Sequence, residues 1–493
     1  MKLVIDVLLI NPPTPVFMDN KEFMFPPSLL YLASYASQFG YSATLLDLNL
    51  HLNKANSTIP CDYDVYLDIV CERVRRDHPA VIGLGCLFSG QFPFVNAAAR
   101  RIKATCSDVV ICVGGIHPTI FAKDILEHCP DIDFVVSGEG EEQFVEILHQ
   151  SKDPEHSITC EGIGYRDHGH IVFREKHCFI QNLDSLPMPD YSLVNFDAYR
   201  HDLSKWHNPK GQVFDSSVPL ITSRSCPNRC NFCSMFLVMG LKFRARSADN
   251  VLQELEYLYH VHNVRHFSIM DDNFTFSKKR TLQICNEIIR RKLDIQFDTP
   301  NGLMVRTLDQ EVVDAMAEAG WVRGSIAIES GSDYIRNKVI GKGLQRETIF
   351  EVLGFISRHP QVFLRAYFIM GFPEETHQTL ADTWDMIEEM HIDDIYVNNL
   401  LPFPGTKLYA QCVRDNLLLK VAPRNIWQAD FLYMNGNDEF FIKPYAMTVE
   451  ELAVYRKRFN VLLTSKRKKA RERRTAWNLS RQDHASAANP ALN

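Results

Sequence analysis

Short apolar runs with β-strand character alternate with helix-forming segments along most of this 493-residue chain, and this alternation limits its fold more than any other feature. Strands that are buried on both faces and separated by helices pair in parallel, because each helix returns the chain to the same edge of the sheet. The chain is also too long for a single hydrophobic core. The sequence therefore predicts an α/β protein of two or three domains.

The first series, residues 1–150, predicts a doubly wound parallel sheet of the Rossmann type. Its strand candidates are Leu3–Ile10, Ala43–Leu48, Val81–Cys86, Val109–Val113 and Phe134–Val136. Its helix candidates are Ser28–Gln38, Pro93–Ala104, Ile120–His128 and Glu141–Gln150. Ligands of such sheets bind beyond the carboxyl ends of the strands, so the residues that directly follow each strand are candidate ligand contacts.

Glycines are frequent among the residues that directly follow these strands. They let a bulky ligand approach the backbone closely, because no Cβ stands in the way. Taken singly, each glycine pair also fits a tight turn, and no Gly-x-Gly-x-x-Gly motif follows the first strand to indicate a dinucleotide. The candidate contacts at this edge are Pro12, Pro13, Gly85, Phe88, Ser89, Gly114, Gly115, His117, Gly138, Glu139 and Glu141.

Residues 151–217 form a connector. The stretch 164–173 predicts a β-hairpin around His168-Gly169, and the prolines within 183–191 exclude a continuous helix. Several histidines in the connector are metal-ligand candidates by residue type alone, and we do not predict a metal site from them.

A second series, residues 218–422, contains six strand candidates, the first five of them followed by a helix. This pattern predicts a partial (β/α) barrel, open on one side, with its chemistry at the carboxyl ends of the strands. The strands are Val218–Thr222, His266–Met270, Ile295–Thr299, Gly324–Ile328, Val362–Met370 and Asp394–Leu400. The helices are Ala248–His260, Lys278–Arg291, Leu308–Ala319, Arg346–Ser357 and Thr376–Met390.

Three thiols follow the first of these strands, as Cys226, Cys230 and Cys233 in the spacing Cys-x3-Cys-x2-Cys. Iron–sulfur clusters usually take four cysteines, and structural zinc sites close with four Cys or His ligands. A set of three can bind three irons of a cubane cluster and leave the fourth iron open to a substrate. The spacing alone also fits a zinc protein.

The order of motifs resembles the radical S-adenosylmethionine (SAM) enzymes that carry an amino-terminal cobalamin-binding domain. The cysteine loop, with an aromatic residue before its last cysteine, matches the radical SAM signature. Upstream, Leu-Ile-Asn-Pro-Pro, Gly-Gly-Ile-His-Pro and Ser-Gly-Glu-Gly-Glu follow one another as in the cobalamin domain, and 402–406 repeats the family's Pro-x-Pro-Gly-Thr loop. The resemblance covers residues 3–420.

By this resemblance, the three cysteines ligate a [4Fe-4S] cluster whose fourth iron binds SAM, and the candidates in residues 1–150 line a cobalamin site. Residues 271–273 stand where the family has Gly-Gly-Glu, so which atom meets the methionine ammonium stays open; Asp271 and Asp272 could instead cap the following turn. The residues implied to contact SAM are Phe232, Asp271, Asp272, Asn273, Glu329, Ser330 and Gly371.

Residues 1–150 lack the Asp-x-His-x-x-Gly motif that supplies a lower axial histidine to cobalt in many other cobalamin proteins. In the resembling family, the loop that carries His117 is a wall of the site for the cobalamin nucleotide tail. The resemblance therefore implies a lower face of cobalt without a protein histidine, with Phe88 or Ser89 below it.

The implied activity is reductive cleavage of SAM to a 5'-deoxyadenosyl radical, followed by methylation of an unactivated carbon or phosphorus centre through methylcobalamin. A small-molecule or peptide substrate and a reductant such as flavodoxin or ferredoxin belong to this reaction. Two alternatives stay open. One is a non-methylating relative, such as an oxidative cyclase or a ring-rearranging enzyme, and the other is a cobalamin- or zinc-binding regulator without catalysis.

The last part, residues 423–478, predicts an irregular start and a helix from Val449 to Trp477, with a disordered tail over 479–493. The basic run Lys466–Arg474 suits a solvated helix end better than a nucleic-acid arm, because no aromatic residues are interleaved. The net charge of -7 and the lack of a run of about 18 apolar residues indicate neither nucleic-acid nor membrane partners. The 13 cysteines, scattered singly outside the loop, indicate a reduced, cytoplasmic protein.

Overall fold

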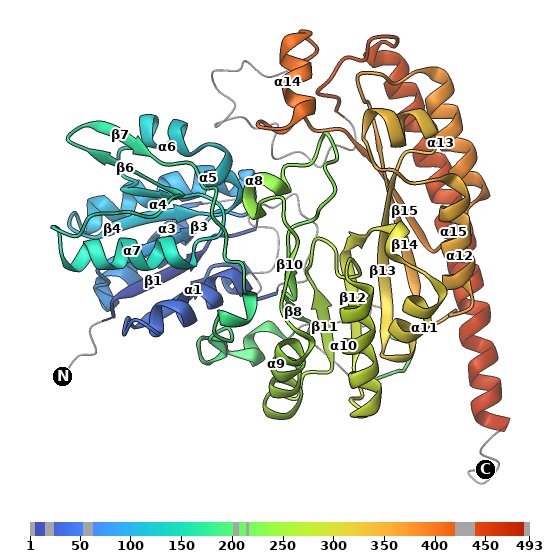
Figure 1. Ribbon diagram of the computed structural model, residues 1–493, viewed down its shortest axis with the longest axis horizontal. Helices are drawn as coiled ribbons and strands as arrows, with labels where there is room; N and C mark the ends of the chain where they lie inside the picture. Colours follow the sequence, from blue (N-terminus) through green and yellow to red (C-terminus); the bar gives the residue numbers. More distant parts are fainter. Residues whose placement is uncertain are drawn as a thin grey trace.

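Two α/β parts lie side by side in the structure (Figure 1). The amino-terminal part is blue to cyan, the barrel runs from green through yellow to orange, and α8 (Met235–Met239) lies between them. This computed structural model describes residues 5–14, 24–52, 63–200, 207–212, 216–419 and 439–487, the side chains of the last helix as far as residue 479.

The amino-terminal sheet has the strand order β2-β1-β3-β4-β5-β6-β7, and its first five strands pair in parallel. They are β1 (Val7–Asn11), β2 (Ala43–Asp47), β3 (Val81–Gly85), β4 (Val110–Gly114) and β5 (Phe134–Val136). Separate hydrophobic clusters cover the two faces of this sheet. The predicted doubly wound fold is confirmed.

The helices of this part flank both faces of the sheet (Figure 1). They are α1 (Pro27–Ser37), α2 (Asn49–Leu52), α3 (Tyr63–Asp77), α4 (Phe92–Thr105), α5 (Ile116–Ile120), α6 (Ala122–His128) and α7 (Glu141–Lys152). Sequence reasoning missed α3, although its buried Tyr66, Leu67, Val70, Cys71 and Val74 repeat at helical spacing.

The hairpin predicted in the connector belongs to the same sheet. Strands β6 (Ile163–Asp167) and β7 (His170–Phe173) are antiparallel, and β6 pairs with β5. His168 and Gly169 both have positive φ, as the turn of such a two-residue hairpin requires. The sheet therefore continues beyond residue 150.

The second sheet has six parallel strands in the order β15-β14-β13-β12-β11-β8, which confirms the predicted partial barrel. They are β8 (Val218–Leu220), β11 (His266–Ile269), β12 (Gln296–Leu303), β13 (Trp321–Glu329), β14 (Phe363–Met370) and β15 (Asp394–Asn399). The helices are α9 (Ala248–Val261), α10 (Lys278–Arg290), α11 (Gln310–Glu318), α12 (Arg346–Ser357), α13 (His377–Glu389) and α14 (Lys407–Arg414).

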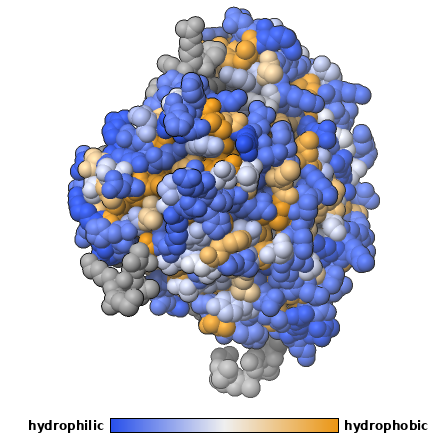
Figure 2. Space-filling view, turned by 60° about the vertical axis from the view of Figure 1, so that its left-hand side comes forward, coloured by the Kyte–Doolittle hydropathy of each residue, from blue (hydrophilic) through white to orange (hydrophobic). Residues whose placement is uncertain are grey.

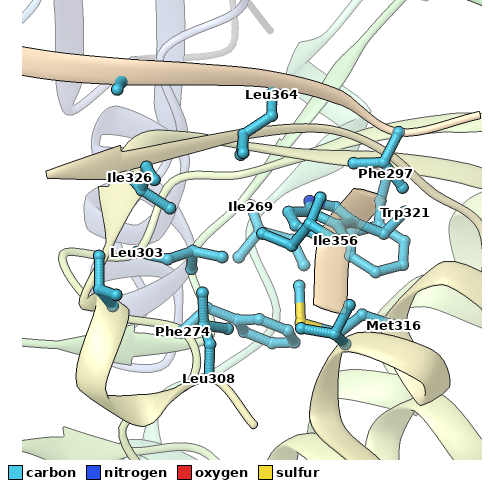
Figure 3. Close-up of a cluster of buried hydrophobic side chains, with 14 of the residues drawn as sticks. Ile269, Phe274, Phe297, Leu303, Leu308, Met316, Trp321, Ile326, Ile356 and Leu364 are labelled. Atoms are coloured by element: carbon cyan, nitrogen blue, oxygen red, sulfur yellow. The ribbon is translucent and has the colours of Figure 1, made fainter. Parts of the chain in front are cut away.

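Large apolar side chains fill the space between these strands and their helices. In Figure 3, Phe297 and Trp321 lie together at one side of the cluster with Met316 below them, and Phe274 and Leu308 lie across from Met316. Trp321 is fully buried, and its indole N–H donates to the Thr299 hydroxyl at 3.1 Å. The one polar atom of this large side chain is thus satisfied, which allows complete burial.

The last helix, α15, runs from Val449 to Ala487 along the outer side of the barrel, in red in Figure 1. It extends beyond the predicted end at Trp477 into the predicted tail, of which 488–493 lie outside the described residues. The basic run is partly docked: Arg467 binds Asp394 at 2.7 Å, and Arg474 binds Asp393. The expected solvated helix end is therefore corrected for these two arginines.

The segment before α15 contacts both parts of the molecule through consecutive residues. Phe440 joins the hydrophobic core of the barrel, and Phe441 joins a core cluster of the amino-terminal part. Both side chains are buried. This segment therefore helps to hold the two parts together.

Replacing Phe459 of α15 by alanine should lower the free energy of unfolding by about 3–5 kcal/mol, because Phe459 is fully buried and packs on Trp384 with ring centroids 5.8 Å apart. Urea denaturation followed by circular dichroism measures the change. Val461 on the same helix is 71% exposed, so Val461→Ala should alter the value by less than about 0.5 kcal/mol. Equal effects of the two substitutions would show that α15 does not pack on the barrel in this way.

Candidate functional site

The cysteine loop is the connection of a small antiparallel ribbon. Strands β9 (Ser223–Arg224) and β10 (Arg244–Ala245) form its stem, and all three cysteines lie between them. Ser225 opens the loop with a φ of 73°, and its hydroxyl donates to the Gly240 carbonyl at 2.7 Å. A positive φ is unusual for serine, so the stem fixes the direction in which the loop leaves the barrel.

The thiols of Cys226, Cys230 and Cys233 are half-buried and free. Burial raises the pKa of all three, that of Cys233 to about 12, but backbone N–H groups of Asn228 and Met235 donate to Cys226 and Cys233 and favour their thiolates. Among the described residues, no three His, Cys, Asp or Glu side chains converge on a single metal ion. Thiols that bind three different irons of a cluster need no such convergence, so the donor set fits a cluster.

Neighbouring barrel loops hold the cysteine loop in place. The Asn231 N–H donates to the Ile340 carbonyl at 3.2 Å, and the Asn231 carbonyl accepts from Leu408 N–H at 3.0 Å. Phe232 packs on Phe372, with ring centroids 6.1 Å apart. Phe232 therefore belongs to the apolar wall next to the Gly371 turn, and its contact with SAM stays a prediction.

The acidic residues after β11 have different surroundings. Asp271 is buried and accepts from the Thr222 N–H at 2.6 Å and from the hydroxyls of Thr222 and Ser223. Asp272 is half-buried and accepts from the Ser225 N–H; burial and then Asp271 raise its pKa to about 6. Asp271 thus braces the stem of the cysteine loop, while Asp272 lies within electrostatic range of Cys226 and Cys233.

The structure places Asn273 and Ser330 in the barrel wall. Asn273 is buried, and its amide approaches the sulfur of Met304 at 4.0 Å. Ser330 is buried, and its hydroxyl lies 3.3 Å from that of Thr383. Both side chains thus have contacts inside the protein, and their contact with SAM stays a prediction.

Glu329 ends β13 with a φ of 72°, and its carboxylate pairs with the Lys342 ammonium at 2.5 Å. Both side chains are buried, so the pair satisfies two charges that would be costly alone. Lys342 also lies within electrostatic range of Cys226 and Cys230. A residue with a strained backbone whose carboxylate lies next to the cysteines is a candidate for a ligand contact.

The turn after β14 is built around buried Glu375. Gly371 adopts a φ of 97°, and its N–H donates to Glu375 Oε2 at 3.1 Å, while the Thr379 hydroxyl donates to Oε1 at 2.8 Å. Burial raises the pKa of Glu375 to about 7. The Gly371 backbone thus faces an internal carboxyl group, and the predicted contact of Gly371 with SAM stays untested.

At the carboxyl edge of the amino-terminal sheet, hydrogen bonds connect the loops that carry the predicted cobalamin contacts. Gln91 accepts from the N–H groups of Leu87 and Phe88 and donates to the Pro12 carbonyl at 3.4 Å. The Cys86 N–H donates to the Gly114 carbonyl at 2.7 Å. Gly115 has a φ of 124°, and a Cβ there would lie 2.4 Å from the Cys86 carbonyl oxygen, so only glycine fits.

His117 is fully buried beneath this edge. Its ring stacks on Phe92 with centroids 4.5 Å apart, and Nδ1 lies 2.9 Å from the Ser89 hydroxyl. Burial lowers its pKa to about 3, so the ring is neutral. Among the described residues Nε2 has no hydrogen-bond partner, which a bound polar group could supply.

Leu87 and Phe88 of the same loop are 53% and 40% exposed. Figure 2, which brings the amino-terminal part forward, shows apolar surface running between polar borders on this side of the molecule. Pro12 and Pro13 are buried, and a Cβ at Gly85 would lie 3.7 Å from Pro12 Cδ. The exposed Leu87 and Phe88, together with the His117 Nε2 that has no hydrogen-bond partner among the described residues, fit a large ligand of mixed polarity, such as cobalamin.

Glu139 and Glu141 stand apart from the other cobalamin candidates. Both carboxylates are buried and form ion pairs with the arginines of the β9–β10 stem. Gly138, with a φ of 72°, lies against α8, since a Cβ there would be 3.0 Å from the Val238 carbonyl oxygen. These three residues thus contact the cysteine loop region, and contact with cobalamin stays a prediction for them.

Sequence reasoning missed several charged residues at this site. Arg224 directly precedes the cysteine loop, which is a usable signal, whereas nothing in the local sequence around Lys342 or Arg306 indicates that either lies near the cysteines. Arg306 donates to the Asn228 side chain at 2.6 Å. Long-range packing places these groups, so spacing along the chain does not reveal them.

Comparisons with known proteins agree with this geometry. The B12-binding domain model matches residues 16–148, and the radical SAM superfamily model matches residues 220–387. An uncharacterized methyltransferase of Pyrococcus horikoshii is 30% identical over 72% of this chain and 74% of its own length. The cytidylyl-2-hydroxyethylphosphonate methyltransferase of Streptomyces wedmorensis is 25% identical over 96% of this chain and 92% of its own.

A solved structure shares the fold. The radical SAM methyltransferase TsrM from Kitasatospora setae, with tryptophan substrate and a SAM analog bound, superimposes with a TM-score of 0.68 at 16% identity, over 85% of this chain and 77% of its own. Among the described helices, none has both the length and the apolar character needed to span a membrane.

Glu375 predicts a pH dependence of stability. Its pKa rises from 4.5 in the unfolded chain to about 7 in the fold, so between these values the native state binds more protons. The stabilisation is complete below pH 4.5 and is lost as the pH rises through 7, by up to about 3 kcal/mol. Glu375→Gln should therefore flatten the fall in unfolding free energy between pH 5 and 8, measured by urea denaturation. The exposed Glu389→Gln serves as control; identical pH profiles for wild type and Glu375→Gln would contradict this account.

Proposed function

We infer that this chain, which belongs to the radical SAM enzymes with an amino-terminal cobalamin-binding domain, is a cobalamin-dependent methyltransferase. One observation carries the proposal. Three free thiols at the carboxyl end of the first barrel strand lie in a loop whose stem is bonded to the carboxyl edge of the amino-terminal sheet. The proposed places of the cluster and of cobalamin are thus directly connected.

When bound, the cluster with SAM supplies a 5'-deoxyadenosyl radical, and cobalamin carries the methyl group. Cys226, Cys230 and Cys233 are the residues that would hold the cluster. Asp272 would accept a hydrogen bond from the SAM ammonium; in support, its carboxylate lies within electrostatic range of Cys226 and Cys233. Glu329, which pairs with Lys342, would accept hydrogen bonds from SAM hydroxyl groups.

Apolar packing near the site would limit the access of water to the reacting groups. Phe232 and Phe372 form an apolar wall beside the cysteine loop, and Phe440 and Phe441 pack into the two cores that flank the junction. Radicals are quenched by side reactions when solvent or loose groups approach, so a dry site protects them.

The substrate is a small molecule that presents an unactivated carbon or phosphorus centre. The names of the relatives support this choice: one methylates a cytidylyl phosphonate, and TsrM binds tryptophan. A peptide substrate is compatible with the same chemistry. A one-electron reductant such as flavodoxin or ferredoxin is needed to reduce the cluster, and the free thiols throughout the described residues suit a reducing, cytoplasmic setting.

Methyl transfer is tested by anaerobic reconstitution with iron, sulfide and hydroxocobalamin, followed by SAM with a labelled methyl group and a cell extract. We expect label on a metabolite, together with 5'-deoxyadenosine and S-adenosylhomocysteine, because one SAM yields the radical and another yields the methyl group. Formation of 5'-deoxyadenosine without S-adenosylhomocysteine or transferred label would instead indicate a cyclase or a rearranging enzyme. No cleavage of SAM would contradict both and favour a regulator.

Replacing Cys226, Cys230 or Cys233 by alanine should each abolish the formation of 5'-deoxyadenosine, because two thiolates do not hold the cluster. Binding of hydroxocobalamin should be largely retained, since its proposed site lies in the other part of the chain. Equilibrium dialysis and iron analysis measure the two properties. Cys285→Ala is the matched control, because Cys285 is fully buried in the barrel away from the loop. Retention of SAM cleavage in any loop variant would contradict the assignment.

A further inference from the structure

The stem of the cysteine loop carries two arginines directly opposite each other. Arg224 on β9 pairs in register with Arg244 on β10. Like charges in this arrangement repel, so the ribbon is stable only where other groups neutralise them. The chain between the two arginines is the cysteine loop. The position of the stem therefore determines where the loop lies.

The neutralising groups come from the other part of the molecule. Glu139 and Glu141 follow β5, at the edge where the cobalamin loops end. Glu139 Oε1 lies 3.0 Å from Arg224 and 2.6 Å from Arg244, and Glu141 Oε1 lies 2.5 Å from Arg224. All four side chains are at most 7% exposed, so each charge depends on the others.

Backbone contacts lie beside these ion pairs. The Glu139 carboxylate also accepts from the Ile180 N–H at 3.1 Å, and Arg244 donates to the Ile180 carbonyl at 2.8 Å and to that of Met239 at the end of α8. Gly138 allows α8 to approach the β5 loop, as its backbone has no Cβ to meet Val238. The loop that holds the last cysteine is thus fixed against the amino-terminal part at several points.

Stability alone does not explain such a network. The attraction within a buried ion pair is little larger than the free-energy cost of removing its charges from water. Well-packed apolar residues would stabilise the junction to a similar extent. What the network adds is geometry, because a planar guanidinium accepts only a narrow range of carboxylate positions. Burial alone would raise the pKa of Glu141, but Arg224 outweighs it and lowers that pKa, so this carboxylate is ionised.

We propose that Arg224 and Arg244 are positioning residues that fix the distance between the bound cobalamin and the cluster, through Glu139 and Glu141. The inference rests on the proposed function, since it concerns the relation of the two cofactors. It goes further by assigning these four residues to the alignment of the sites, in place of a direct contact of Glu139 and Glu141 with cobalamin.

Lysine in place of Arg224 tests the role of geometry. An ammonium keeps the positive charge but offers no planar fork, so it does not hold both carboxylates in their present positions. The cysteine loop would then no longer be held in one position relative to the residues that follow β5. The predicted ligands of each cofactor would be unchanged. Glu141→Gln is the second variant, because it removes one charge with little change in volume.

The distance itself can be measured by pulsed EPR. Wild type and variants are reconstituted anaerobically with iron and sulfide, loaded with hydroxocobalamin and reduced with dithionite, which makes both the cluster and cobalt paramagnetic. We expect one narrow distance in wild type. In Arg224→Lys and Glu141→Gln the distance distribution should shift or broaden, with iron and cobalamin contents equal to those of wild type.

Arg166→Lys is the matched control, because Arg166 donates to the carbonyls of Leu126, Cys129 and Ile132 within the amino-terminal part only. It should lower stability but keep the wild-type distance. If both test variants also keep that distance, the network has only a structural role and the inference is wrong. If Arg224→Lys does not fold, Glu141→Gln decides alone. Failure of wild type to take up cobalamin or the cluster would overturn the proposed function and, with it, this inference.

Discussion

The buried ion pairs between the edge of one parallel sheet and the stem of the cysteine loop are the interaction on which the arrangement depends. In each sheet, parallel pairing collects the ends of the strands at one edge. Glu139 and Glu141 lie at one such edge, and Arg224 and Arg244 lie just beyond the other. Because the four charges are buried together, the two edges meet in one orientation, and the proposed cofactor sites lie at these two edges.

A second constraint is chemical. In the proposed site, three thiols would leave a cubane cluster with one open iron, and Asp272 and the Glu329–Lys342 pair lie within electrostatic range of these thiols. At the proposed cobalamin site, Leu87 and Phe88 are exposed, and Nε2 of buried His117 has no hydrogen-bond partner within the described part of the chain. The protein contributes position, charge and dryness, whereas the cofactors contribute the radical and the methyl group.

Sequence reasoning predicted both sheets and the cysteine loop because these depend on local pattern and spacing. It did not predict partners that come from distant segments. Asp271 and Asp272 are adjacent and chemically alike, but their roles differ. Asp271 braces the stem of the cysteine loop, and Asp272 lies within electrostatic range of the cysteines. Glu139 and Glu141 were predicted at the cobalamin edge, and only the packing of the two parts shows that arginines bind them. Helix α3 was missed although its buried residues repeat at helical spacing.

The central claim is that Cys226, Cys230 and Cys233 leave one iron open and that SAM occupies it. Electron–nuclear double resonance of the reduced, reconstituted wild-type protein tests this most directly, with SAM isotopically labelled at its amino nitrogen and carboxylate oxygens. The account predicts hyperfine coupling of both labels to the cluster. A cluster that binds SAM without coupling to either label, or one whose fourth iron already carries a protein ligand, would contradict it.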